Sequence, residues 1–248
     1  MAHTVRDKEI MSMNCPICGT LSADLINITN DNSFWFRCCC GVVFQNEAPR
    51  QDVYDDKYRA DYEKTQDSRE RTIKAPDLYL PMIEDLTMGR LVLEVGYNLP
   101  YNKDYFNDRG WIYFGIDVNS PIEKSKRYIQ GDFETFNFPE GTKFNLIWLS
   151  HVLEHFNDPI AALQKAESLL HKEGVIYIAT PDTDWINRLG IPDWPHWRKK
   201  EHYIMWNQKS IKKELERLKF NVLLSRSNYS TQHNAWYDFH TFAQKIAY

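Results

Sequence analysis

Five cysteines near the N-terminus have the spacing of metal ligands. All lie between Cys15 and Cys40: Cys15 and Cys18 share a CPICG turn, and Cys38 begins a CCCG run. Zn²⁺ prefers four thiolates in a closed tetrahedral site, and the nineteen residues between the two turns suit that arrangement. We therefore predict a Cys₄ zinc ribbon formed by Cys15, Cys18, Cys38 and Cys40, with Cys39 as the alternative to Cys40. Buried cysteines without a metal are the competing interpretation.

A second candidate site is a tight turn after an apolar strand, in the stretch LVLEVGYNLPYN from Leu91 to Asn102. Gly96 follows the strand, where a glycine lets the backbone bend sharply or approach a ligand. The next apolar strand, Trp111 to Val118, carries Asp117 near its end. In a βαβ unit this spacing presents a carboxylate to the ribose of a nucleotide bound over the first turn. The pair predicts a nucleotide site, and an ordinary turn glycine is the alternative.

Strands and helices alternate along the chain around these residues. Beyond the strand at Leu91, we predict strands at 111–118, 129–133, 144–150, 175–180, 220–225 and 236–243, and helices at 102–109, 122–126, 159–170 and 210–218, with a helical, charged segment at 54–85. Such alternation indicates a parallel sheet with right-handed crossovers, and the last two strands are expected to form an antiparallel pair at its edge. Ser210 is the expected cap of the last helix.

Two further motifs complete a family pattern. The strand FNLIWLS runs from Phe144 to Ser150 into HVLEH at His151 to His155, and IQGDF ends on Asp132 and Phe133. With Gly96 and Asp117, these motifs resemble class I methyltransferases that depend on S-adenosylmethionine (SAM). The resemblance extends over roughly Leu86 to Tyr248 and implies an α/β, Rossmann-like, mostly parallel seven-stranded sheet with helices on both faces.

The resemblance also implies a set of cofactor residues. They are Gly96 and Asn98 at the methionine portion, Asp117 at the ribose, Asp132 with Phe133 at the adenine, Ser150 and His151 in the SHVLEH segment, and Glu94 in an indirect role. Where the family has three loop glycines, this chain has Gly96, Asn98 and Pro100. Asparagine tolerates a left-handed backbone, whereas Pro100 offers no N–H to a cofactor. An inactive binding or scaffold protein with a degenerate loop is therefore the alternative function.

Motifs near the N-terminus indicate which class of molecule accepts the methyl group. CPICG, then FRCCCGVVFQN and YDDKYRADYEK, are similar to the zinc-binding segment that precedes the SAM domain in small-molecule methyltransferases, including those acting on sugars. This similarity implies a zinc-binding segment at 1–50, linker helices at 51–85 and a methyltransferase domain at 86–248. It also implies that the acceptor is a sugar or nucleotide-sugar.

Three histidines are candidates for the base that deprotonates the acceptor. Glu201-His202-Tyr203 resembles an E-H pair followed by an aromatic residue in sugar methyltransferases with a zinc segment, so His202 is the predicted base and Glu201 its orienting partner. His155 and His151 are the alternatives, and their spacing of four residues would place them on one helix face, where a metal could also bind. A packed histidine without a catalytic role is the competing interpretation for each.

Composition limits the partners and the location. The chain has 248 residues, with 30 Lys and Arg against 34 Asp and Glu, so it offers no dedicated nucleic-acid surface. Neither an apolar run of membrane-spanning length nor the apolar core of a secretory signal occurs, so we expect a cytoplasmic protein without membrane partners. Aromatic residues make up 14% of the chain and concentrate between Asp182 and Trp206, which suggests a segment that covers a substrate.

Overall fold

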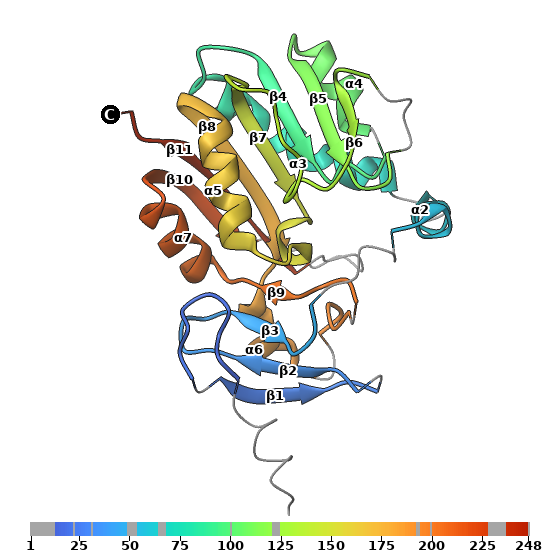
Figure 1. The fold of residues 1–248 in the computed structure, drawn as a ribbon, viewed down its shortest axis with the longest axis vertical. Helices are drawn as coiled ribbons and strands as arrows, with labels where there is room; N and C mark the ends of the chain where they lie inside the picture. The colour runs from blue at the N-terminus through green and yellow to red at the C-terminus, as the bar shows by residue number, and fades with distance from the viewer. Residues whose placement is uncertain are drawn as a thin grey trace, which may run out of the picture.

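The computed structural model describes residues 13–21, 23–30, 32–48, 54–63, 68–99, 101–120, 125–191, 194–198, 200–227 and 237–247. Its central element is a seven-stranded sheet with the strand order β10-β11-β8-β7-β4-β5-β6 (Figure 1). The strands are β4 (Leu91–Val95), β5 (Ile112–Asp117), β6 (Tyr128–Gln130), β7 (Phe144–Ser150), β8 (Leu170–Pro181), β10 (Phe220–Ser227) and β11 (Asp238–Lys245).

Five neighbouring strands of this sheet, β8 to β6 in its order, pair in parallel. β11 runs antiparallel to both β8 and β10. The prediction of a mostly parallel, Rossmann-like sheet with an antiparallel pair at one edge is therefore confirmed.

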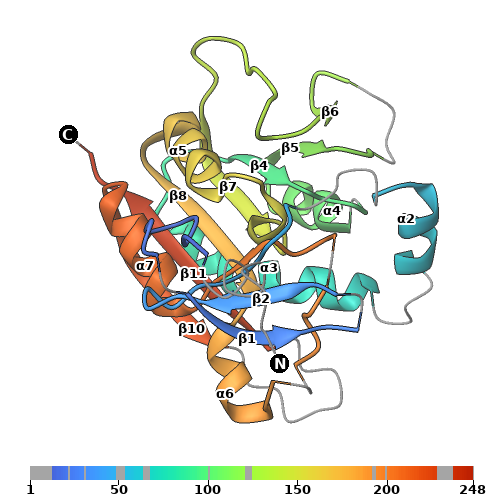
Figure 2. The same ribbon diagram turned by 60° about the horizontal axis from the view of Figure 1, so that its bottom comes forward.

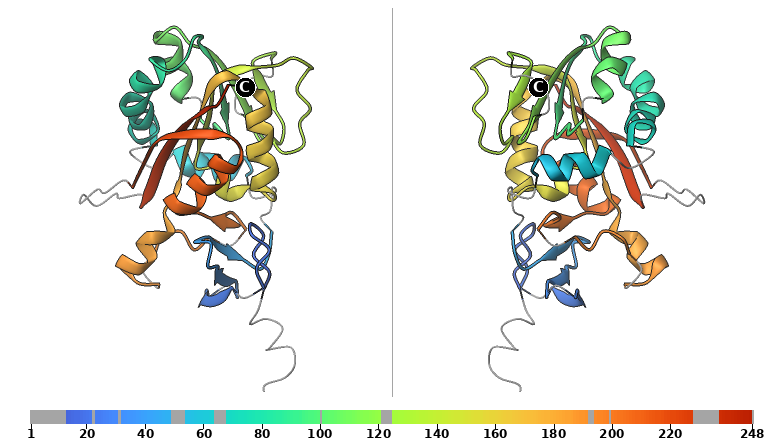
Figure 3. Two further views of the ribbon diagram at one scale, coloured as in Figure 1. Left: turned by 90° about the vertical axis from the view of Figure 1, so that its left-hand side faces the viewer. Right: turned by 90° about the vertical axis from the view of Figure 1, so that its right-hand side faces the viewer.

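Helices cover both faces of the sheet (Figure 3). On one face, α3 (Ser68–Glu84) and α4 (Tyr101–Asp108) bury apolar side chains such as Leu80 and Phe106 against Trp148 of β7. On the other face lie α5 (Pro159–Leu169) and α7 (Gln208–Arg217), which contribute Leu163 and Leu215 to a second core cluster. Removing such side chains from water supplies most of the free energy that holds the layers together.

A smaller antiparallel sheet lies beside the carboxyl ends of the parallel strands (Figures 1 and 2). It contains β1 (Asp24–Ile28), β2 (Phe34–Arg37), β3 (Val43–Gln45) and β9 (Ile204–Met205), in that order. Because β9 comes from the segment between β8 and α7, this sheet combines N-terminal and C-terminal parts of the chain. The predicted boundary at residue 50 remains a prediction, and the small sheet extends beyond it through β9.

The aromatic segment between Asp182 and Trp206 mainly builds core. It holds a 3₁₀ turn (Thr183–Trp185) and α6 (Ile186–Leu189). Trp185 and Trp194 are buried against Trp35 and Val43 of the small sheet, and Trp206 is fully buried in the main core. The expectation of an aromatic surface over a substrate is therefore wrong for these three side chains, because the small sheet buries Trp185 and Trp194 and the main core buries Trp206.

Two local predictions need correction. His151 has a left-handed backbone (φ 52°), and only a 3₁₀ turn, Leu153–His155, follows it, so His151 and His155 do not share a helix face. Asn207 is the N-cap of α7, and Ser210 is its partner three residues later in a capping box.

The remaining element predictions have mixed outcomes. The helices predicted at 102–109 and 159–170 are confirmed as α4 and α5, and the helical segment 54–85 contains α2 (Asp56–Glu63) and α3. The predicted leader at 1–12 and most of the short helix at 122–126 lie outside the described residues. Over the part of the chain that the structure describes, no helix combines the length and apolar character needed to cross a membrane.

Candidate active site

The turn after β4 is shaped by Gly96 and Asn98. Gly96 has a φ of 70°, its N–H donates to the Ile116 carbonyl at 2.8 Å, and an added Cβ would lie 2.7 Å from Cγ2 of Val152. Any side chain at position 96 would therefore strain both the backbone and the packing. Asn98 has a φ of 43°, the left-handed conformation that the sequence predicted it could adopt. Pro100 lies outside the described residues.

Asp117, at the end of the neighbouring strand, holds this turn in place. Its Oδ2 accepts from the Asn98 N–H at 2.9 Å and its Oδ1 from the Asn119 N–H at 2.8 Å. Arg59 of α2 donates to the Asn119 carbonyl. Burial raises the pKa of Asp117, and the two backbone N–H groups oppose that shift. The structure thus brings the predicted loop and the predicted ribose-binding acid together.

Asp132 and Phe133 follow β6 and differ in exposure. Asp132 is half-buried and its Oδ1 accepts from the Glu134 N–H at 2.8 Å. Phe133 is buried, with its ring centroid 5.9 Å from that of Phe156 and the Lys165 ammonium 5.4 Å from its centre. Asp132 therefore offers the more accessible group, while Phe133 forms part of the core beneath it.

Glu94 lies inside the sheet. Its two carboxyl oxygens accept from Asn102 Nδ2 at 2.6 Å and from the Tyr113 hydroxyl at 2.7 Å. Burial raises the pKa of Glu94 to about 7, although both hydrogen bonds work in the opposite direction. These contacts link β4 to α4 and β5, which agrees with an indirect role at the loop.

Ser150 ends β7, and the left-handed His151 after it turns the chain. The His151 N–H donates to the Ala179 carbonyl at 2.8 Å, and Nε2 and Nδ1 lie 3.3 Å from Asp238 Oδ2 and 3.5 Å from Glu154 Oε1. Burial alone would lower the pKa of His151, but the two carboxylates outweigh it and raise the pKa to about 10. The two carboxylates therefore favour the protonated form of His151.

Glu154, His155 and His202 form a buried cluster beside the turn. One carboxylate oxygen of Glu154 and one ring nitrogen of each histidine lie within 4.8 Å of one another. The Thr180 hydroxyl donates to Glu154 Oε2 at 2.9 Å. The sequence drew attention to both histidines but missed Glu154; an acid among the histidines of HVLEH was the available signal.

The predicted partnership between Glu201 and His202 is wrong in its geometry. The Glu201 carboxylate lies 3.3 Å from Arg198 Nη1 and 3.5 Å from the Tyr58 hydroxyl, whereas its backbone carbonyl accepts from His155 Nδ1 at 2.9 Å. His202 instead donates from Nδ1 to the His196 carbonyl at 3.0 Å. Adjacent side chains point in different directions along a chain, and here Glu201 turns toward Arg198 while His202 is buried beside the His196 carbonyl.

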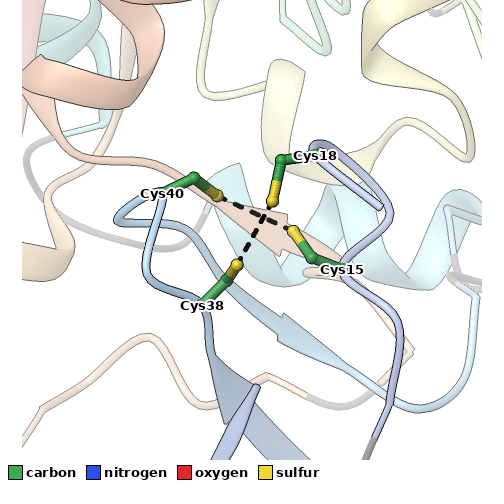
Figure 4. Close-up of side chains that lie close together, drawn as sticks. All are labelled: Cys15, Cys18, Cys38 and Cys40. Carbon is green, nitrogen blue, oxygen red and sulfur yellow. Dashed lines mark hydrogen bonds between the residues drawn. The ribbon is translucent and has the colours of Figure 1, made fainter. Parts of the chain in front are cut away.

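The four predicted cysteines converge from two turns (Figure 4). The sulfur atoms of Cys15 and Cys40 are 3.7 Å apart and those of Cys18 and Cys38 are 3.4 Å apart. Four sulfurs bound about 2.3 Å from one tetrahedral ion would be separated by about 3.8 Å, so the cluster has the dimensions of a zinc site. Cys39 is exposed and lies outside the cluster.

Sheet order, glycine turn and strand-end carboxylate together define the class of SAM-dependent methyltransferases. A family profile described as a methyltransferase domain matches residues 68–225, and the chain belongs to this family. Among curated proteins, it is 26% identical over 107 residues to the ubiquinone biosynthesis O-methyltransferase of Haemophilus ducreyi. That match covers 37% of this chain and spans 45% of the relative's length.

Solved structures share the fold at low identity. A SAM-dependent methyltransferase from Archaeoglobus fulgidus superposes with a TM-score of 0.58 at 18% identity, covering 77% of this chain and 100% of that one. The 1,6-didemethyltoxoflavin-N1-methyltransferase of Burkholderia thailandensis, with its substrate and S-adenosylhomocysteine bound, gives 0.54 at 14% identity, covering 91% of this chain and 100% of that one.

Proposed function

We propose that the protein transfers the methyl group of SAM to a small-molecule acceptor of the sugar or nucleotide-sugar class. The observation that carries the cofactor assignment is the contact between the Asn98 N–H and the Asp117 carboxylate, which fixes a left-handed turn over the carboxyl ends of β4 and β5. Open α/β sheets bind nucleotides at this edge. The Burkholderia thailandensis relative holds the small molecule for which it is named, and the Haemophilus ducreyi relative is named for ubiquinone biosynthesis, which supports a small-molecule acceptor. The similarity of the N-terminal segment to sugar methyltransferases supports the finer class.

The cofactor positions proposed here follow the sheet edge. Gly96, Asn98, Ser150 and His151 would line the methionine portion, Asp117 would accept from the ribose hydroxyls, and Asp132 would face the adenine with Phe133 supporting it from the core. Glu94 would act at one remove, by holding α4 through Asn102. When bound, SAM supplies an electrophilic methyl group, and the chain has to orient it toward the acceptor.

The acceptor must lose a proton if it reacts through a hydroxyl group. In the simplest form of the proposal, His202 takes that proton, with His155 as the second candidate and Glu201 contributing through its backbone carbonyl to His155. Glu154 has a carboxylate oxygen within 4.8 Å of a ring nitrogen of each histidine, and we propose it in place of Glu201 as the carboxylate that acts on them. A positioned base contributes about two to four orders of magnitude to the rate.

We also propose that Cys15, Cys18, Cys38 and Cys40 hold a structural zinc ion. Hydrogen bonds from the Gly19 and Gly41 N–H groups to the Cys15 and Cys38 carbonyls, both 2.9 Å, close the two turns around the four sulfurs. All four positions of a tetrahedral ion would be filled by protein, which indicates a structural role. A reducing compartment such as the cytoplasm would keep these thiols available.

An acceptor screen tests the proposed function. Purified protein is incubated with SAM carrying a labelled methyl group and with three acceptor classes: nucleotide-sugars, catechols and nitrogen heterocycles. We expect label in the nucleotide-sugar only, and we expect His202→Ala to reduce its transfer by about two to four orders of magnitude without weakening SAM binding. Transfer to a catechol or heterocycle instead would contradict the sugar assignment, and equal loss of SAM affinity in His202→Ala would make His202 a structural residue.

A further inference from the structure

We propose that Glu154, His155 and His202 bind a divalent transition-metal ion, in a site separate from the four cysteines. The proposal rests on the proposed function, since it specifies how the cluster beside the cofactor turn would act on the acceptor. Its ligand atoms converge within 4.8 Å although they come from two distant parts of the chain. Glu154 and His155 belong to the turn after β7, and His202 lies just before β9.

A backbone carbonyl lies within hydrogen-bond distance of Nδ1 in each histidine. His155 Nδ1 lies 2.9 Å from the Glu201 carbonyl, and His202 Nδ1 lies 3.0 Å from the His196 carbonyl. A carbonyl oxygen can only accept, so a neutral His202 ring holds its proton on Nδ1 and keeps a lone pair on Nε2. His155 Nδ1 also lies 2.7 Å from the Tyr54 hydroxyl, and a neutral His155 ring has the same tautomer when that hydroxyl accepts from it. Metal-bound histidines in proteins typically have this arrangement, with the distal N–H anchored to a carbonyl or carboxylate.

Neither Nε2 has a hydrogen-bond partner among the described residues. His155 Nε2 lies 3.9 Å from Glu154 Oε1, and the His155 and His202 rings are 4.9 Å apart between centroids. Two ligands bound at about 2.1 Å to one ion lie about 3 to 4 Å apart, so the cluster needs only a small contraction to close around a cation.

Glu154 provides the strongest indication of an absent ligand. Its side chain is fully buried, and Oε2 is satisfied by Thr180, whereas Oε1 makes no hydrogen bond within the described part of the chain. A buried carboxylate oxygen without a hydrogen bond costs free energy that a directly bound cation would recover. His151 lies 3.5 Å from Oε1, but its own charge is shared with Asp238 on its other side.

The position of the cluster fits a role in methyl transfer. Val152, two residues before Glu154, packs directly against Gly96 of the cofactor turn. Two histidines and one carboxylate leave further coordination positions for a substrate oxygen. An acceptor hydroxyl bound there would release its proton to water more readily; its oxygen would then bond to the methyl carbon as the carbon–sulfur bond breaks, leaving that electron pair on sulfur. His202 would then be a ligand and not the base.

Manganese titration of the full chain tests this site. Mn²⁺ favours oxygen and nitrogen ligands over thiolates, so it reports the new site while zinc stays on the cysteines. Electron paramagnetic resonance of free Mn²⁺ should show one bound ion per chain. We expect Glu154→Gln, which keeps the shape of the side chain, and His202→Gln to weaken binding at least about tenfold. His171→Gln, at an exposed histidine, should bind as the wild type does.

Parallel SAM titrations separate this proposal from the proposed function. A wild-type protein that binds SAM but takes up neither Mn²⁺ nor Co²⁺ beyond its cysteine-bound zinc would overturn the metal site and leave His202 as the base. Unchanged Mn²⁺ affinity in Glu154→Gln would overturn it as well. If a variant unfolds, the absorption spectrum of Co²⁺ added to zinc-loaded wild type gives a second test. Co²⁺ bound by nitrogen and oxygen ligands should show visible absorption without the charge-transfer band that a cysteine thiolate would give. A folded wild-type protein that binds Mn²⁺ but does not bind SAM would instead contradict the proposed function.

Discussion

Glu94 is a buried carboxyl group whose protonation should be visible in the stability of the fold. Its pKa is raised from 4.5 to about 7, mainly by burial. A raised carboxyl pKa means that the folded state binds the proton more tightly than the unfolded state does, so this contribution is fully present below about pH 4.5 and is lost as the pH rises to about 7. The shift corresponds to about 3 kcal/mol.

Glu94→Gln should remove this pH dependence. Glutamine cannot ionise, and its amide can donate to Asn102 Oδ1, which is buried without a partner among the described residues. Chemical denaturation at pH 5 and pH 8 should show the variant losing less free energy of unfolding over that interval than the wild type, by about 2 to 3 kcal/mol. Parallel pH profiles for the two proteins would mean that Glu94 is ionised in the folded state throughout.

For single residues, the sequence predicted local conformational preferences better than it predicted contacts between distant side chains. Asn98 was expected to accept a left-handed backbone and does so, because that tolerance is local to the side chain. The proximity of His202 to Glu154 could not be predicted, because it depends on how the segment before β9 packs against the turn after β7. Sequence neighbourhood suggested Glu201 instead, and its carboxylate faces Arg198.

Among the elements, α7 depends on a cap that also joins it to the segment before it. Asn207 Oδ1 accepts from the Ser210 N–H at 2.9 Å, and Asn207 Nδ2 donates to Asp184 Oδ1 at 3.0 Å. Asn207→Ala loses both contacts and should lower the free energy of unfolding by about 1 to 2 kcal/mol, measured by urea denaturation. Asn207→Ser keeps a capping oxygen and should lose less; equal losses would show that the cap contributes nothing.

The two cysteine turns should respond selectively to substitution. Cys38→Ser removes one of four thiolates and should abolish stoichiometric zinc and destabilise the small sheet, because metal affinity and folding are coupled at such sites. Cys39→Ser is the matched control, since Cys39 is exposed and outside the cluster. Metal analysis should find about one zinc per chain in the wild type and in Cys39→Ser, because the four clustered cysteines fill one tetrahedral site. Zinc-free, fully folded wild-type protein would rule the site out.

Element predictions succeeded where a local pattern was strong. Apolar runs predicted β4 and β7, and helical spacing of apolar residues predicted α5. Buried parallel strands and amphipathic helices differ in hydrophobic periodicity, so each can be identified from its own sequence. β9 has only two residues and pairs with β3 from the far end of the chain, so nothing in its own sequence marks it as a strand. The left-handed turn at His151 was likewise hidden, because HVLEH also suits a helix.

In the whole molecule, the small N-terminal sheet also contains a strand from the C-terminal half of the chain. β9 completes the N-terminal sheet, and Trp185 and Trp194 fill the interface between that sheet and the segment after β8. His202 lies on this inserted segment, so docking of the small sheet positions one member of the candidate active-site cluster. A zinc ion in the cysteine turns would therefore support the active site indirectly, by stabilising the sheet against which this segment packs.

Calorimetric titration of SAM into the purified chain decides whether this fold binds SAM with Asn98 and Pro100 in its loop. We expect one SAM site per chain. Asp117→Ala should weaken SAM binding by about 1.5 to 3 kcal/mol for each charge-assisted hydrogen bond lost. Asp108→Ala, which changes an exposed acid at the end of α4, should bind SAM as the wild type does. No binding by folded wild-type protein would favour the inactive scaffold. Equal affinity in wild type and Asp117→Ala would show that SAM does not lie over the turn after β4.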